Sequence, residues 1–71
     1  MYTVGIDIGS VSINCVVVDK HGDLTYEAPY QRHFGRFVPE TLETLQSIYD
    51  RFGEKHIQSV SFTWRSLLEF L

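Results

Sequence analysis

The feature that most constrains the fold is a pair of apolar runs near the N-terminus, residues 2–8 and 12–19, separated by Gly9-Ser10. Apolar side chains occupy every second position of the first run, and the second run is apolar on both faces. This period of two predicts β-strands, and a strand that is apolar on both faces is expected inside a sheet. We expect Gly9 to adopt the positive φ that tight hairpin turns require. The sequence therefore predicts a hairpin with a polar turn.

The next segments predict a third strand, a loop and a helix. Residues 24–28 alternate and end before Pro29, which lacks the N–H that an interior ladder uses. Residues 30–38 show no sustained period and are interpreted as a solvated loop. Pro39 suits the first turn of a helix, and Gly53 suits its end. An apolar stripe at helical spacing is expected to pack on the core, namely Leu42, Leu45, Ile48, Tyr49 and Phe52.

Residues 57–64 alternate strictly and predict a fourth strand, with Val60, Phe62 and Trp64 on one face. The expected fold class is α/β: an antiparallel three-strand meander, a helix, and a strand parallel to the first. We interpret residues 1–71 as a single partial domain in which one helix covers one face of the sheet. A second copy or further chain is expected to cover the other face. The apolar end of the chain is a candidate surface for self-association, with Phe62, Trp64, Leu67, Leu68, Phe70 and Leu71.

Size and composition exclude several classes of protein. A chain of 71 residues with one cysteine has a small core and no internal disulfide, so we expect either a homo-oligomer or a missing remainder of the chain to complete the core. The net charge is −3, and the six cationic residues are scattered, which argues against a nucleic-acid surface. No apolar run approaches the roughly 20 residues of a membrane span, and no secretory leader is visible. We therefore expect a cytoplasmic protein without membrane contact.

The cysteine and the histidines give no sign of a metal site. Cys15 lies within the second apolar run and is interpreted as a small core residue. His21, His33 and His56 fall in separate predicted loops without cysteine or carboxylate at ligand spacing. We interpret all three histidines as ordinary exposed side chains.

The first turn carries the candidate chemistry. Asp7 ends a strand two residues before Gly9, so a carboxylate lies beside backbone N–H groups that could face outward. Exposed amides of such a turn attract anions, and Mg²⁺ prefers oxygen ligands such as a carboxylate and phosphate oxygens. Ser10 adds a hydroxyl, and Gly9 has no Cβ to obstruct a phosphate. An ordinary structural turn is the alternative interpretation.

Residues 4–10 and 15–19 resemble the start of the sugar kinase, heat-shock protein 70 and actin superfamily. More narrowly they resemble the ATPase activators of 2-hydroxyacyl-CoA dehydratases and benzoyl-CoA reductases, the CoA-substrate-specific enzyme activases. The resemblance implies a ribonuclease H-like, actin-type half-domain and an N-terminal fragment of such an activator. Asp7 would face Mg²⁺ through water, and the nucleotide would be bound by Gly9, Ser10, Val11 and Asn14.

The resemblance also implies ATP and Mg²⁺ as cofactors and an acyl-CoA dehydratase or reductase as partner of the parent protein. The [4Fe-4S] cluster of that family has no ligands in this chain. Val11 replaces a frequent threonine and Asn14 a common lysine, so phosphate neutralisation is altered, and Trp64 follows Thr63 where the family usually has a glycine-containing turn. The second phosphate loop and the adenosine-binding segment are missing, so we expect the chain alone to be inactive.

Two alternatives remain. The first is a fragment of another kinase of the same superfamily, such as a sugar or acetate kinase. The second is a small interaction domain that associates with itself through its apolar end. Cluster cysteines further along the parent chain would favour the activator, and a sugar-binding loop would favour the kinase.

Overall fold

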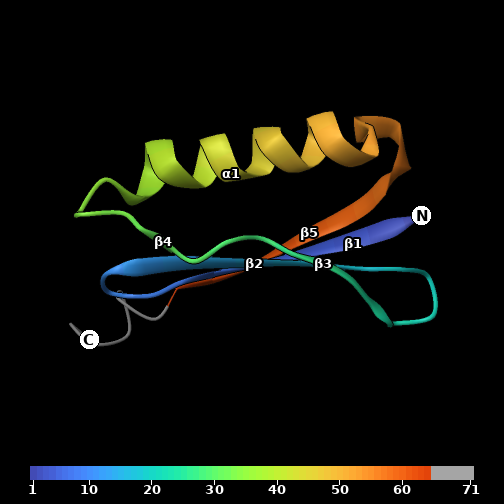
Figure 1. The fold of residues 1–71 in the computed structure, drawn as a ribbon, viewed down its shortest axis with the longest axis horizontal. Coiled ribbons are helices and arrows are strands. Elements are labelled where there is room, and N and C mark those ends of the chain that lie inside the picture. The colour runs from blue at the N-terminus through green and yellow to red at the C-terminus, as the bar shows by residue number, and fades with distance from the viewer. Residues whose placement is uncertain (65–71) are drawn as a thin grey trace.

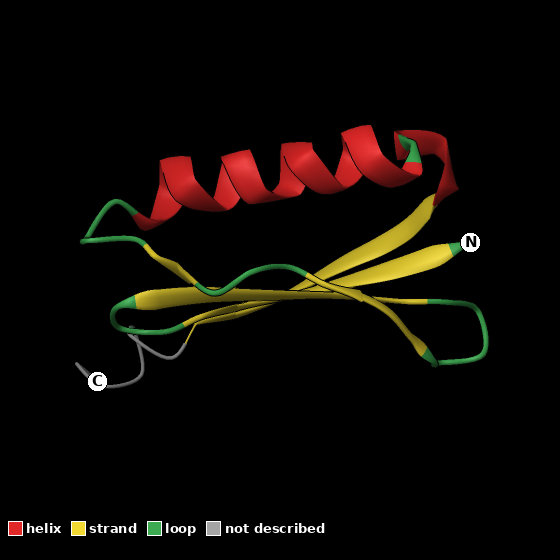
Figure 2. Ribbon diagram, in the orientation of Figure 1, coloured by secondary structure: helices red, strands yellow, loops and turns green. Residues whose placement is uncertain are grey.

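A computed structural model describes residues 1–64 as a mixed five-stranded sheet with a long helix on one face (Figures 1 and 2). The helix α1 spans Phe37–Phe52, and a short 3-10 turn, Glu54–His56, follows it. The strand order is β3-β2-β1-β5, with β4 also paired to β2. The strands are β1 (Tyr2–Ile8), β2 (Ser12–Val18), β3 (Leu24–Glu27), β4 (Gln31–Arg32) and β5 (Ile57–Trp64).

The pairing confirms the predicted α/β class and the order of its main elements. β2 pairs antiparallel with β1 and with β3, so the first three strands form the expected meander. β5 pairs with β1 in parallel after the helical crossover. The period of two in the sequence identified these four strands because each has one face on a common core.

The prediction of an unpaired loop over residues 30–38 is wrong in two respects. Gln31 and Arg32 form β4, which pairs with Ile13 and Ser12 of β2. The helix begins at Phe37, two residues before Pro39. Two residues are too few to show a period, so β4 arises from pairing with β2 rather than from its own pattern.

The core lies between α1 and the sheet. Its fully buried members come from β1, β2 and the C-terminal half of the helix. Aromatic rings close one end, where the centroids of Tyr2 and Phe52 lie 4.9 Å apart. Cys15 is 2% exposed, as predicted for a core residue, and burial raises the pKa of its thiol. The buried apolar residues are Val4, Ile6, Ile8, Ile13, Cys15, Val17 and Ile48.

The buried face of α1 differs from the predicted stripe. Thr41 and Thr44 are buried with Ile48, whereas Leu42 is 60% exposed. Leu45 and Phe52 pack on the core as expected. Leu42 lines a hollow with Phe62 of β5, and β5 ends the strand order on that side. The prediction for Leu42 is therefore wrong because the sheet provides no further strand beneath it within residues 1–64.

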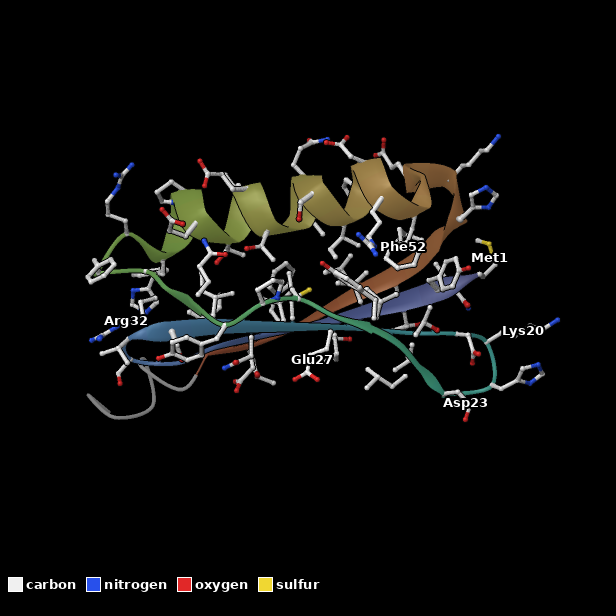
Figure 3. All side chains as sticks on the ribbon, viewed as in Figure 1. Met1, Lys20, Asp23, Glu27, Arg32 and Phe52 are labelled. Carbon is white, nitrogen blue, oxygen red and sulfur yellow. The ribbon has the colours of Figure 1, made fainter. Side chains whose placement is uncertain are left out.

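The second face of the sheet is uncovered within residues 1–64, as the sequence predicted (Figure 1). Glu27, labelled in Figure 3, projects from this face, which also carries Asp7, Asn14 and Thr63. No helix of the described chain has the length and apolar character needed to cross a bilayer. The predictions for the side chain of Trp64 and for residues 65–71 lie outside the described residues.

Candidate functional site

Asp7 lies on the uncovered face of the sheet, between two polar neighbours. The strand register places Asn14 of β2 on one side of it and Thr63 of β5 on the other. The Thr63 hydroxyl donates a hydrogen bond of 2.6 Å to Oδ1 of Asp7. The register therefore places a polar residue on each side of Asp7 near the carboxyl end of β1, and Thr63 orients its carboxylate.

A shallow hollow of about 230 Å³ surrounds this carboxylate. Three strands present their uncovered faces to the hollow, and the surface that lines it is almost entirely apolar although several of its residues are small or polar. The residues of the hollow on this face are Gly5, Asp7, Asn14, Val16, Ser61 and Thr63.

The turn from Gly9 to Ser12 lies at the end of β1, next to Asp7. The Gly9 N–H donates to the Ser12 carbonyl at 2.8 Å, which closes the turn. The backbone N–H groups of Ser10 and Val11 donate to no protein atom within residues 1–64. These two amides, rather than the amide of Gly9, can receive an anion.

The conformation of Gly9 corrects the prediction of a positive φ. Among the described glycines, a left-handed φ occurs at Gly22, Gly35 and Gly53 but not at Gly9. A Cβ added to Gly9 would lie 3.6 Å from the nearest atoms of Ser12, which is ordinary contact. The turn closes through four residues, so its shape does not require glycine. Within residues 1–64, neither the backbone conformation nor the surrounding space explains a glycine at position 9.

His33 corrects a second prediction, because it is buried with 3% of its surface exposed. Its Nε2 lies 2.9 Å from the Gly9 carbonyl oxygen, and its Nδ1 accepts from the Gly35 N–H at 2.9 Å. A carbonyl only accepts and an amide N–H only donates, so the ring is neutral with its proton on Nε2. The His33 N–H also donates to the Val11 carbonyl at 3.0 Å. His33 therefore fixes the segment after β4 to the β1–β2 turn.

The donor atoms present fit Mg²⁺ but not an iron–sulfur cluster. Within residues 1–64 no three His, Cys, Asp or Glu side chains converge on a common point. Mg²⁺ needs only one or two carboxylates when phosphate oxygens and water complete its shell, and Asp7 could supply one. A [4Fe-4S] cluster needs several cysteine thiolates, whereas this chain has only Cys15, in the core.

The predicted site residues occupy two adjoining places. Asp7 and Asn14 share the uncovered face, while Gly9, Ser10 and Val11 form the turn beyond it. Sequence reasoning missed two neighbours, Thr63 and His33. The alternation of Ser59, Ser61 and Thr63 against apolar residues was a usable signal for Thr63, because it placed a polar face on the strand beside Asp7. No local pattern distinguishes a buried histidine in a segment without a period.

Comparison with known proteins provides no relative. No protein-family model, curated protein or solved structure matches the chain.

Proposed function

We propose that the Gly9–Ser12 turn binds the phosphates of ATP, with Mg²⁺ between them and the Asp7 carboxylate. The observation that carries this proposal is the pair of backbone amides at Ser10 and Val11, which donate to no protein atom within residues 1–64 and follow the oriented Asp7 by three and four residues. Adjacent backbone N–H groups in a turn form an anion-binding concavity. Because nothing within residues 1–64 requires a glycine at position 9, a ligand that approaches its backbone closely would explain it.

We further propose that the sheet and helix are part of a ribonuclease H-like, actin-type ATPase domain. The strand order β3-β2-β1-β5, with β5 parallel to β1, supports this fold type. By the resemblance of residues 4–19, the parent protein would be an activator of a CoA-substrate-specific dehydratase or reductase. A sugar or acetate kinase would use the same turn for the same phosphates, so the proposal for Asp7, Ser10 and Val11 is common to both.

The residues have distinct roles in this proposal. The Ser10 and Val11 amides donate to phosphate oxygens, and the Ser10 hydroxyl is a further donor at the exposed tip. Asp7 holds the metal, which neutralises phosphate charge when bound. Thr63 keeps one oxygen of Asp7 in a fixed direction, so the carboxylate is ordered before ligand arrives. Asn14 adds a neutral polar group on the other side of Asp7.

Calorimetric titration with ATP tests the proposal. We expect the wild-type chain to bind ATP in the presence of Mg²⁺ and to bind much more weakly in excess chelator. Asp7→Asn should remove the dependence on Mg²⁺, because it removes the charge and leaves the side-chain shape. Thr3→Val, on the same face and strand, is the matched control and should bind as wild type. Equal affinity with and without Mg²⁺ would refute the role of Asp7.

We expect no useful ATP hydrolysis by this chain alone. A phosphoryl transition state is stabilised by several converging groups. Within residues 1–64, the proposed phosphate site provides one carboxylate and one turn for this purpose. A phosphate-release assay should stay at background with Mg²⁺-ATP. Turnover on the order of tens per minute that disappears in Asp7→Ala would contradict the expectation.

A second candidate function is self-association. A hollow of about 250 Å³ opens beside the β5 end of the sheet, lined by Ile8, Val38, Thr41, Leu42 and Phe62. Val38, Leu42 and Phe62 are each more than half exposed. We call these five residues the β5-side apolar patch. Because exposed apolar patches favour association, we propose a homo-oligomer formed through this patch.

A further inference from the structure

The proposed phosphate site lacks a cation on the strands that form it. A triphosphate carries several negative charges, and Asp7 adds another to the same face. Asn14, beside Asp7 on β2, is neutral. A bound triphosphate therefore needs a positive side chain from another element, in addition to Mg²⁺.

The structure assigns this role to Arg32 of β4: we propose that its guanidinium contacts the phosphates bound at the Gly9–Ser12 turn. The inference rests on the function proposed above. Arg32 pairs with Ser12 in the antiparallel register. Directly opposed residues in such a pair point to the same face, so Arg32 shares the uncovered face with Ser12, Asn14 and Asp7.

The neighbouring pair confirms this assignment of faces. Gln31 is paired with the buried Ile13, on the helix side of the sheet. Its side chain accepts a hydrogen bond from the Thr44 hydroxyl at 3.1 Å and donates to the carboxylate of Glu40, both on α1. Since adjacent strand residues alternate, Arg32 points away from α1. Its guanidinium lies 5.5 Å from the centroid of the exposed Phe34 ring.

Two sets of bonds hold the backbone of Arg32 close to the turn. On the helix side, Gln31 anchors β4 to α1. On the turn side, the next residue, His33, donates from its backbone to Val11 and from its ring to Gly9. Figure 3 shows Arg32 at the end of the sheet where the β1–β2 turn lies. These bonds hold the backbone of a cationic residue next to the turn that carries the Ser10 and Val11 amides.

The other cations of residues 1–64 are placed differently. Lys20 lies at the opposite end of the sheet in Figure 3. Arg51 stacks over the ring of Tyr26, with its Cζ at 4.2 Å from the centroid. Lys55 belongs to the short turn after α1. Arg36 directly precedes α1 on the helix side of the sheet. It lies at the same end of the sheet as Arg32, so its substitution is the matched control for the loss of one positive charge.

Calorimetric titration with Mg²⁺-ATP and with Mg²⁺-tripolyphosphate tests the inference in the 71-residue chain. Arg32→Gln should raise both dissociation constants about fivefold, the effect of an exposed charge pair. Arg32→Lys should recover part of the loss, because a point charge remains without the planar fork. Arg36→Gln removes the same charge and should change both constants less than about twofold. Arg32 is exposed, so unchanged amide spectra should verify the fold of each variant.

The outcomes separate this inference from the function on which it rests. If the wild type binds both ligands and Arg32→Gln binds them with the same dissociation constants as the wild type, the role of Arg32 is overturned and the phosphate turn is left intact. Equal losses in Arg32→Gln and Arg36→Gln would also overturn it, because they would show a general charge effect. An effect on ATP without one on tripolyphosphate would place Arg32 at the base or ribose and overturn the phosphate contact. No binding by the wild type would overturn the proposed function itself.

Discussion

His33 is the residue that ties the β1–β2 turn to the segment before α1. Its ring is buried, donates to Gly9 and accepts from Gly35, and both bonds are part-buried. We expect His33→Ala to lower the free energy of unfolding by about 1–3 kcal/mol, since it removes two part-buried hydrogen bonds at once. His33→Gln retains a donor and an acceptor and should lose less. Urea unfolding of both variants at neutral pH measures the difference, and an alanine variant as stable as wild type would contradict this account.

Asp19 makes the turn after β2 sensitive to acid. The N–H groups of Asp23 and His21 donate to its Oδ1 at 3.1 and 2.8 Å, and they lower the pKa of the carboxyl. A lowered pKa in the folded state contributes stability above the unfolded pKa, and this stability is lost as pH falls through the folded pKa. We expect Asp19→Asn to be less stable than wild type at neutral pH. The difference should disappear in acid below the folded pKa.

The midpoint for Asp19 is measured by its carboxyl ¹³C shift during an acid titration. It should lie below the midpoint of an aspartate in an unstructured peptide, because the two N–H groups stabilise the charged carboxylate. A midpoint for Asp19 at or above the value in an unstructured peptide would contradict the assigned hydrogen bonds.

At the scale of elements, we expect the substitution of glycine by alanine to have opposite effects on stability in two turns. Gly53 ends α1 with a φ of 87°, and a Cβ there would lie 3.0 Å from Cδ2 of His56. Gly53→Ala should therefore destabilise the fold by about 1 kcal/mol or more. Gly9 has neither constraint, so Gly9→Ala should leave stability unchanged or raise it by up to about 1 kcal/mol. Thermal unfolding of the two variants compares them directly.

The same pair of variants separates structure from binding. In our proposal Gly9→Ala weakens binding of Mg²⁺-ATP although it does not weaken the fold, because its Cβ obstructs the phosphate. A stable Gly9→Ala variant with wild-type affinity would leave the glycine unexplained and count against the site.

The strands, the helix and their order follow from the sequence because their periods reflect burial on one face. The boundaries of β4 and the start of α1 do not, since β4 has two residues and is held by its pairing with Ser12 and Ile13. The predicted burial of Leu42 is wrong for a related reason. The sequence shows which residues share a helix face, but it does not show where the sheet beneath that face ends. Asp7 and the turn were identified from their own residues, whereas Thr63, His33 and Arg32 reach this place only through tertiary pairing.

At the scale of the whole molecule, the described chain has one helix on one face of its sheet and a β5-side apolar patch at one edge. We expect the chain to self-associate at high micromolar concentration, because association removes this patch from water. Leu42→Gln should shift the equilibrium toward monomer. Leu24→Gln is the matched control, since Leu24 is 61% exposed against 60% for Leu42 but lies on β3 at the opposite edge of the sheet.

Light scattering after size-exclusion chromatography measures the mass of each variant over a range of concentrations. A monomeric wild type at the highest concentration, or equal effects of the two substitutions, would contradict association through the β5-side apolar patch.

The central claim is that the exposed turn of the hairpin binds nucleotide phosphate beside Asp7. The most direct measurement is an amide NMR titration of the 71-residue chain with millimolar Mg²⁺-ATP. We expect saturable changes in amide chemical shift that are largest at Ser10 and Val11 and smaller at Asp7 and Asn14. We expect no change at Lys20, at the far end of the sheet. No shift at Ser10 and Val11, or shifts confined to the β5-side apolar patch, would contradict it.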